Sequence, residues 1–301
     1  MTLLLHIGYH KTGSTALQTW LSEHKAVLNP HSITFPVGLS TWTGHPEIAW
    51  AFAGNRYGWQ DRNYNLDHVK EYYQPYLEKS SEHNSLVILS SEEFCRLDFE
   101  IDVILELRDW LSAFKPIICG YVRNPWDFLL SRYRHEVQEG GESRSLHEFL
   151  SNIDNILSAN FHTRTLVWEK CFNNRCIFRN YSEFSGEKSV VQAFTILLGL
   201  PDTNIVTTNS HSEAEQKIHP TLLDGVRLLY LQDMDVTERG KVIDSMLSLS
   251  RSLPDLSLDK YTESVGISLD IRQLIGSLSI STINLRRTLD DFREVLQSDP
   301  L

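Results

Sequence analysis

Four short apolar runs in the first two thirds of the chain predict buried β-strands, each bounded by residues that break regular structure. The runs are Leu3–Ile7, Ser85–Ser90, Pro116–Val122 and Arg175–Phe178. Between and after them, apolar residues recur at the spacing of amphipathic helices over Ser14–Glu23, Leu66–Glu82, Ile101–Phe114, Trp126–Gln138 and Glu187–Leu198. Strands that alternate with helices are typical of a mostly parallel sheet covered by helices on both faces.

The last third of the chain has a different pattern. From about Ser212 onward no stretch predicts a strand, whereas Leu222–Leu231 and Ile280–Leu296 have helical spacing. The sequence therefore predicts an α/β fold of three layers with a helical C-terminal part. At 301 residues, of which 41% are hydrophobic, the chain is long enough to bury a sizeable core.

Charge and cysteine content narrow the range of partners. The net charge of −11 argues against a nucleic-acid partner, because no broad positive field would attract phosphates, so any anion site must be local. No run of 18 apolar residues predicts a transmembrane helix, and the apolar start Met1–Ile7 lacks the features of a signal peptide. The four scattered cysteines predict neither a disulfide framework nor a metal site, which favours a reduced, cytoplasmic protein. The oligomeric state stays open.

A glycine-rich loop follows the first predicted strand. Gly8 and Gly13 enclose four residues and precede a helix, which is the spacing of a phosphate-binding P-loop. Glycines allow successive backbone N–H groups to point inward, and the helix N-terminus adds partial positive charge. Ser14 occupies the position of the usual P-loop lysine, while Lys11 lies inside the loop. The loop thus predicts an anion site on a P-loop-like fold, but the missing lysine weakens the case for ATP or GTP hydrolysis.

The segment KTGST in this loop resembles the 5′-phosphosulfate loop of the sulfotransferases that use 3′-phosphoadenosine 5′-phosphosulfate (PAPS) as sulfuryl donor. The resemblance implies that the 5′-phosphosulfate is wrapped by Lys11, Thr12, Gly13, Ser14 and Thr15. Ala16 stands where cytosolic members often have a tryptophan, which points away from their steroid and phenol branch.

A second motif begins at the end of the third predicted strand. Arg123 lies at the edge where open α/β sheets bind ligands, and Ser131 lies two turns into the following helix. The pattern Arg-x-Pro-x-Asp-x-x-x-Ser-x-Tyr resembles the 3′-phosphate motif of the same family, in which the arginine and the serine bind that phosphate. A weaker likeness implies that Tyr181 approaches the adenine. The resemblance covers a PAPS-binding domain at residues 1–230 and leaves residues 231–301 as a helical C-terminal extension.

Sulfuryl transfer also needs a base that accepts the proton of the acceptor. The second predicted strand runs into Glu92 and Glu93. The resemblance implies Glu92 as the base, since members of the family place a histidine or a glutamate near the end of this strand. Its neighbour Glu93 would face the opposite way. His45, on an acceptor-side loop, is the rival candidate, and Lys11 would stabilise the leaving phosphate without a metal ion.

The sequence indicates the class of acceptor but not its identity. Nine aromatic residues between positions 42 and 76 could form a stacking wall for a sugar or an aromatic ring, although core packing accounts for more than half of them. The resemblance to bacterial and carbohydrate-type members implies a small-molecule or glycan acceptor, with the desulfated nucleotide PAP as product. Two alternatives are a P-loop nucleotide kinase or NTPase and a non-catalytic nucleotide-binding protein.

Overall fold

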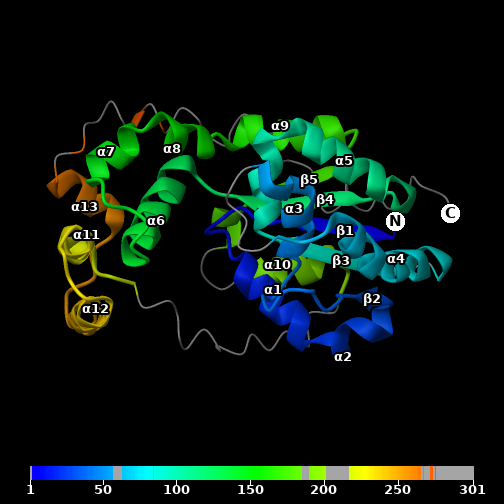
Figure 1. The fold of residues 1–301 in the computed structure, drawn as a ribbon, viewed down its shortest axis with the longest axis horizontal. Coiled ribbons are helices and arrows are strands. Elements are labelled where there is room, and N and C mark those ends of the chain that lie inside the picture. Colours follow the sequence, from blue (N-terminus) through cyan, green and yellow to red (C-terminus); the bar gives the residue numbers. More distant parts are fainter. Residues whose placement is uncertain are drawn as a thin grey trace. The chain divides into compact units, whose positions relative to one another are not determined.

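The computed structural model describes residues 2–56, 63–83, 85–184, 190–200, 217–265, 267, 272–273 and 275. This part of the chain forms two compact units (Figure 1). Unit 1 contains residues 2–123 and 162–200, and unit 2 contains residues 124–161 and the described residues from 217 to 275. The domain boundary expected near residue 230 stays a prediction.

The described part of unit 1 is built on a five-stranded sheet in which all neighbouring strands are parallel. In order across the sheet the strands are β2 (Ile33–Thr34), β3 (Leu86–Ser91), β1 (Leu3–Ile7), β4 (Ile117–Val122) and β5 (Cys176–Asn180). The predicted parallel sheet is therefore confirmed, whereas β2 was not predicted because a two-residue strand gives no periodic signal. Since all strands are parallel, their carboxyl ends share one edge, where open sheets bind ligands.

Helices cover both faces of this sheet, which confirms the three-layer α/β fold. Figure 1 shows α1 (Ser14–Glu23) and α10 (Val190–Leu197) on one side and α5 (Ile101–Leu111) and α9 (Phe161–Cys171) on the other. Side chains of α1 and α10 form a buried core with alternate strand residues such as Leu4, Ile88 and Ile117. The unit also contains α2 (Lys25–Leu28), α3 (Pro46–Ala53), α4 (Leu66–Glu82) and 3-10 helices at Asn29–His31, Gly54–Arg56, Glu93–Phe99, Ser112–Phe114 and Tyr181–Phe184.

The described part of unit 2 is helical. It contains α6 (Pro125–Gln138), α7 (Leu146–Ser151), α8 (Ile153–Ser158), α11 (Leu223–Tyr230), α12 (Val236–Ser250), α13 (Leu258–Ser264) and a 3-10 helix at Pro220–Leu222. The start of α6 is fixed by its own sequence. The Asn124 side chain caps the helix by accepting hydrogen bonds from the N–H groups of Trp126 and Asp127, and Pro125 occupies the first turn. The predicted helix at Leu222–Leu231 is confirmed as α11, whereas the one at Ile280–Leu296 lies outside the described residues.

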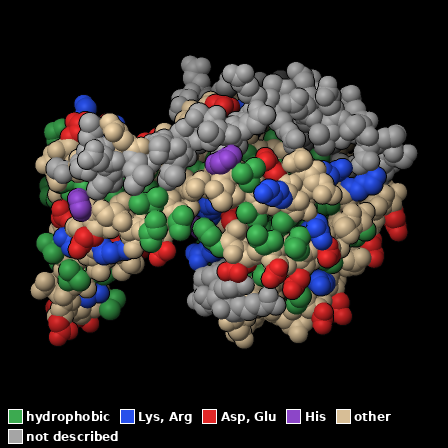
Figure 2. Space-filling model, turned by 90° about the horizontal axis from the view of Figure 1, so that it is seen from above, with side chains coloured by type: hydrophobic (Ala, Val, Ile, Leu, Met, Phe, Trp, Pro, Cys, Tyr) green, Lys and Arg blue, Asp and Glu red, His purple; other side chains and the backbone are tan. Residues whose placement is uncertain are grey.

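Two properties bear on possible partners: membrane-spanning helices and the distribution of charge on the surface. Within the described ranges, no helix has both the length and the apolar character needed to cross a lipid bilayer. On the face drawn in Figure 2, Lys and Arg side chains are interspersed with Asp and Glu rather than gathered in one patch. On this face no single positive patch would gather anions, so an anion site there would depend on local loop geometry.

Candidate functional site at the carboxyl edge of the sheet

The loop between β1 and α1 is tightly curled. The Gly8 N–H donates a hydrogen bond to the Ser91 carbonyl at 3.0 Å, which ties the loop to the end of β3. A Cβ atom at position 8 would lie 2.2 Å from Ser14 Oγ, so only glycine permits this approach. Gly13, at the N-cap of α1, has a φ of 80°, and Lys11 has a φ of 62°. The two glycines of the motif thus allow the curled backbone, in which Lys11 carries local strain.

The hydroxyl groups of the loop have different surroundings. Thr12 is fully buried, and its Oγ1 donates to the Tyr9 carbonyl at 2.5 Å, which closes the loop on itself. Ser14 is only 2% exposed, and its Oγ has no hydrogen-bond partner among the described residues. A buried hydroxyl without a partner is costly, and an anion oxygen held by the loop would satisfy it. Thr15 is exposed. Among these hydroxyls, Ser14 is therefore the one that the structure best prepares for an anion.

Glu92 lies directly after β3 and pairs with the same loop. Its Oε2 is 3.0 Å from His10 Nδ1, and the two side chains are 28% and 34% exposed. Burial disfavours the charged imidazolium, but Cys95 and Glu92 outweigh this effect and raise the pKa of His10 to about 10. Glu93 is engaged elsewhere, 3.1 Å from Arg96 Nε. The predicted base is thus joined to the glycine-rich loop by His10, a residue that the sequence motif does not single out.

His45, the rival candidate for the base, is fully buried directly before α3. Its Nδ1 accepts a hydrogen bond from the Ser90 N–H at 2.9 Å, and its Nε2–H donates to the Pro36 carbonyl at 3.1 Å. Burial lowers its pKa, so the neutral ring is favoured. In this geometry both ring nitrogens hold the backbone, and neither is open to a proton from an acceptor.

Two of the predicted nucleotide ligands reach the loop from neighbouring strands. Arg123 follows β4, and its Nη1 donates to the Lys11 carbonyl at 3.5 Å. Its guanidinium carbon lies 5.8 Å from the centre of the Tyr181 ring, which follows β5. A Cβ atom on Gly13 would lie 3.3 Å from Tyr181 Cε2. The ends of β1, β4 and β5 thus bring these side chains to one loop. Ser131 lies on α6 in unit 2, and its pairing with Arg123 stays a prediction.

A second ion pair supports the loop and was missed by sequence reasoning. Arg164 Nε lies 2.8 Å from Asp98 Oδ2, and Trp168 Nε1 donates to the other carboxylate oxygen. Arg164 also donates to the Cys95 carbonyl at 2.7 Å, and its guanidinium carbon lies 4.7 Å from the centre of the Tyr9 ring. Burial raises the pKa of Asp98 to about 6, an effect that Arg164 opposes. The partners are 66 residues apart, and no periodicity in the sequence connects them.

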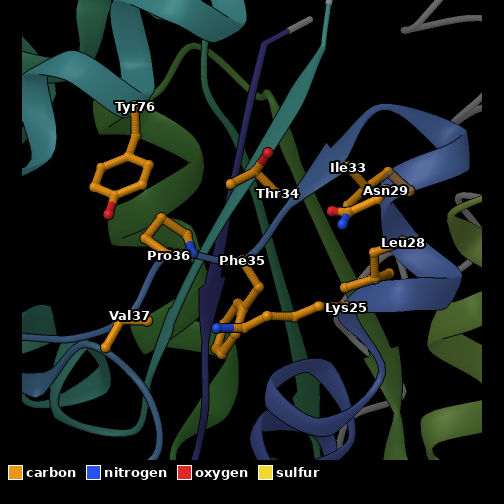
Figure 3. Close-up of a pocket in the computed structure, with 9 residues that line it drawn as sticks. All are labelled: Lys25, Leu28, Asn29, Ile33, Thr34, Phe35, Pro36, Val37 and Tyr76. Carbon is orange, nitrogen blue, oxygen red and sulfur yellow. The ribbon is translucent and has the colours of Figure 1, made fainter.

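A separate pocket of about 210 Å³ lies beside the edge strand β2 (Figure 3). Figure 3 shows Tyr76 of α4 on one side of it and Leu28 of α2 on the other. The lining residues are Lys25, Leu28, Asn29, Ile33, Thr34, Phe35, Pro36, Val37 and Tyr76. None of the predicted site residues lines this pocket. Across the described ranges, no three His, Cys, Asp or Glu side chains are grouped so that they could hold a metal ion.

Comparisons with known proteins give a likeness in structure and none in sequence. No protein-family model matches the chain, and no curated protein does. One similar solved structure is a sulfotransferase from Alicyclobacillus acidocaldarius, with 16% identity, a TM-score of 0.45, and coverage of 80% of this chain and 99% of that one. Another is mouse sulfotransferase SULT7A1 complexed with PAP, with 13% identity, a TM-score of 0.41, and coverage of 99% of this chain and 89% of that one. Similarity at this level decides nothing about the reaction, which must be argued from the site.

Proposed function

We propose that this protein is a sulfotransferase that moves a sulfuryl group from PAPS to a hydroxyl or amine of a small-molecule or glycan acceptor. The observation that carries the proposal is the curled loop, in which the buried Ser14 Oγ has no partner among the described residues and His10 is bonded to the Glu92 carboxylate. The proposed anion cradle and the proposed carboxylate base would thus be adjacent, as transfer of a charged group to a nucleophile that carries a proton requires.

The side chains around the loop suit a nucleotide with two separate anionic groups. Ser14 Oγ and the N–H groups at the start of α1 offer donors to a 5′-phosphosulfate, and Lys11 supplies a positive charge. Arg123 has the planar fork that suits phosphate, and with Ser131 it would bind the 3′-phosphate. Tyr181, beside Arg123, would lie near the adenine. Once bound, PAPS supplies the activated sulfuryl group.

The proposed reaction is an in-line displacement, by analogy with phosphoryl transfer. The acceptor oxygen or nitrogen forms a bond to sulfur while the bond from sulfur to the 5′-phosphate oxygen breaks, and the bonding electron pair stays on that oxygen. Lys11 and the loop N–H groups offset the charge that develops there. Glu92 takes the proton of the acceptor and later releases it to water. The products are the sulfated acceptor, PAP and a proton.

A P-loop kinase or NTPase is the alternative, and Ser14 in the position of the usual lysine disfavours it. Thermal-shift measurements with PAP, ATP and AMP in the absence of metal ions separate the two functions. We expect PAP to give the largest rise in Tm, and turnover with PAPS to persist in EDTA, since Lys11 takes the role of a cation at the leaving group. Binding of ATP that requires Mg²⁺, without a response to PAP, would instead support the kinase.

We also propose a cytoplasmic location. All four cysteines are buried and none forms a disulfide bond in the structure, which is in keeping with a reducing compartment.

A further inference from the structure

We infer that His10 is a positioning residue for the base: through its bond to Glu92 it orients the carboxylate and couples it to the donor-binding loop. The inference rests on the proposed function. Its basis is the 3.0 Å contact between His10 Nδ1 and Glu92 Oε2, formed between two segments that are 82 residues apart in the sequence.

The geometry gives the contact a directional role. The last torsion of a glutamate side chain is broad, so a free carboxylate would sample many directions. With Oε2 held by His10, the direction of Oε1 is fixed as well. No hydrogen bond to Oε1 is found among the described residues, and the Glu92 side chain is 28% exposed, so this oxygen can meet an acceptor. The stem of Glu92 also lies close to the loop, since its Cγ would be 3.1 Å from a Cβ atom added at position 8.

The titratable groups around the pair of Glu92 and His10 lie on different elements. His6 lies on β1, and burial lowers its pKa to about 4, so it is neutral at pH 7. Cys95 lies on the 3-10 helix that follows Glu92 and contacts His10. His10 lies on the loop and is protonated at pH 7, since its pKa is raised to about 10. His10 therefore combines orientation with charge.

Two substitutions separate these effects. His10→Ala removes both the orienting hydrogen bond and the positive charge. We expect turnover to fall about tenfold to a hundredfold, because a catalytic group is then misplaced, while PAP affinity is unchanged. His10→Asn keeps a neutral donor near the position of Nδ1, and we expect it to recover most of the turnover. The matched control is His83→Asn on an exposed histidine that contacts the Lys79 carbonyl, and it should change neither measurement.

An NMR titration of His10 tests the pair without relying on turnover. In the wild-type protein the imidazole should hold its proton to about pH 10. Glu92→Gln should lower this midpoint, while Cys95 continues to raise it. An unchanged midpoint would overturn the inference. So would a His10→Ala variant with wild-type turnover, or one that loses PAP binding in parallel with turnover, since a loop-building role would explain that. A wild-type protein that transfers no sulfuryl group at all would contradict the proposed function instead, and the two failures are thereby distinguished.

Discussion

One ion pair lies at each end of the 3-10 helix Glu93–Phe99, and the two pairs differ in their exposure to water. The pair of Glu92 with His10, before the first residue of the helix, has side chains that are 28% and 34% exposed. The pair of Asp98 with Arg164, near its last residue, has side chains that are 0% and 7% exposed. In the buried pair, both carboxylate oxygens accept hydrogen bonds from other side chains. The first pair can therefore exchange water for a substrate, and the second cannot.

The difference separates a pair suited to chemistry from a pair suited to architecture. A partly exposed ion pair contributes little to stability because water screens it. A buried pair is destabilising to break, since the partner left behind is an unpaired charge in the interior. Arg164 also lies over the ring of Tyr9, so the buried pair supports the segment on which the neighbouring His10 is carried. Substitutions in the first pair should therefore lower turnover, whereas substitutions in the second pair should lower the stability of the fold.

Glu92→Gln should give the largest effect. Glutamine keeps the shape of the side chain and an oxygen that accepts from His10, but it cannot take a proton. We expect turnover to fall by about 10²–10⁴-fold, while PAP affinity and Tm stay nearly unchanged. Steady-state kinetics, calorimetry with PAP and thermal unfolding measure the three quantities. A variant that keeps its turnover but unfolds at a much lower temperature would reverse the roles assigned to the two pairs.

The same contrast shows what could be predicted from the sequence. Helices α1 and α4 were predicted to the residue, because apolar spacing and turn signals are local. Glu92 could be found because it directly follows a predicted strand at the carboxyl edge. The contact of Asp98 with Arg164 could not, since it depends on how α9 packs against a 3-10 helix that carries no periodic signal. The contact of His10 with Glu92 could not be predicted for a similar reason: the partner lies 82 residues away, and the loop motif names only the neighbouring Lys11.

Arg164→Met tests the buried pair. It leaves Asp98 buried without its cation, and we expect the free energy of unfolding to fall by about 3–5 kcal/mol. Urea unfolding followed by fluorescence measures the loss. The matched control is Arg108→Met, which breaks an exposed pair with Asp109 and should cost about 1 kcal/mol at most. Equal losses in the two variants would show that burial does not distinguish the pairs. The double variant with Asp98→Asn should recover part of the stability, because the unpaired charge is then removed.

Arg123→Ala tests whether the half-buried guanidinium at the sheet edge binds a ligand. Its role would then resemble that of the Glu92–His10 pair, which is assigned to chemistry rather than to stability. The proposed guanidinium–phosphate contact contributes about 1.5–3 kcal/mol, so PAP affinity should fall about tenfold to a hundredfold. Adenosine 5′-phosphosulfate lacks the 3′-phosphate, and its affinity should change little. Titration calorimetry with both nucleotides makes the comparison. If the variant weakens both nucleotides equally, Arg123 does not recognise the 3′-phosphate, and its contact with the Lys11 carbonyl is structural.

His45→Asn should have the smallest effect on turnover. His45 resembles the buried pair in its environment, since it is fully buried and both ring nitrogens hold backbone groups. Asparagine can replace one of these hydrogen bonds, so we expect unfolding to become easier by about 1–3 kcal/mol, the cost of one buried polar group left without a partner. Turnover per folded molecule should stay close to that of the wild type, because a neutral ring with both nitrogens engaged does not take the proton of an acceptor. Kinetics below the unfolding transition, with the folded fraction determined by circular dichroism, separate the two effects. A folded His45→Asn variant that binds PAP but has lost turnover would place the base on the acceptor-side loop, and exposure to water would then no longer separate chemistry from architecture in this protein.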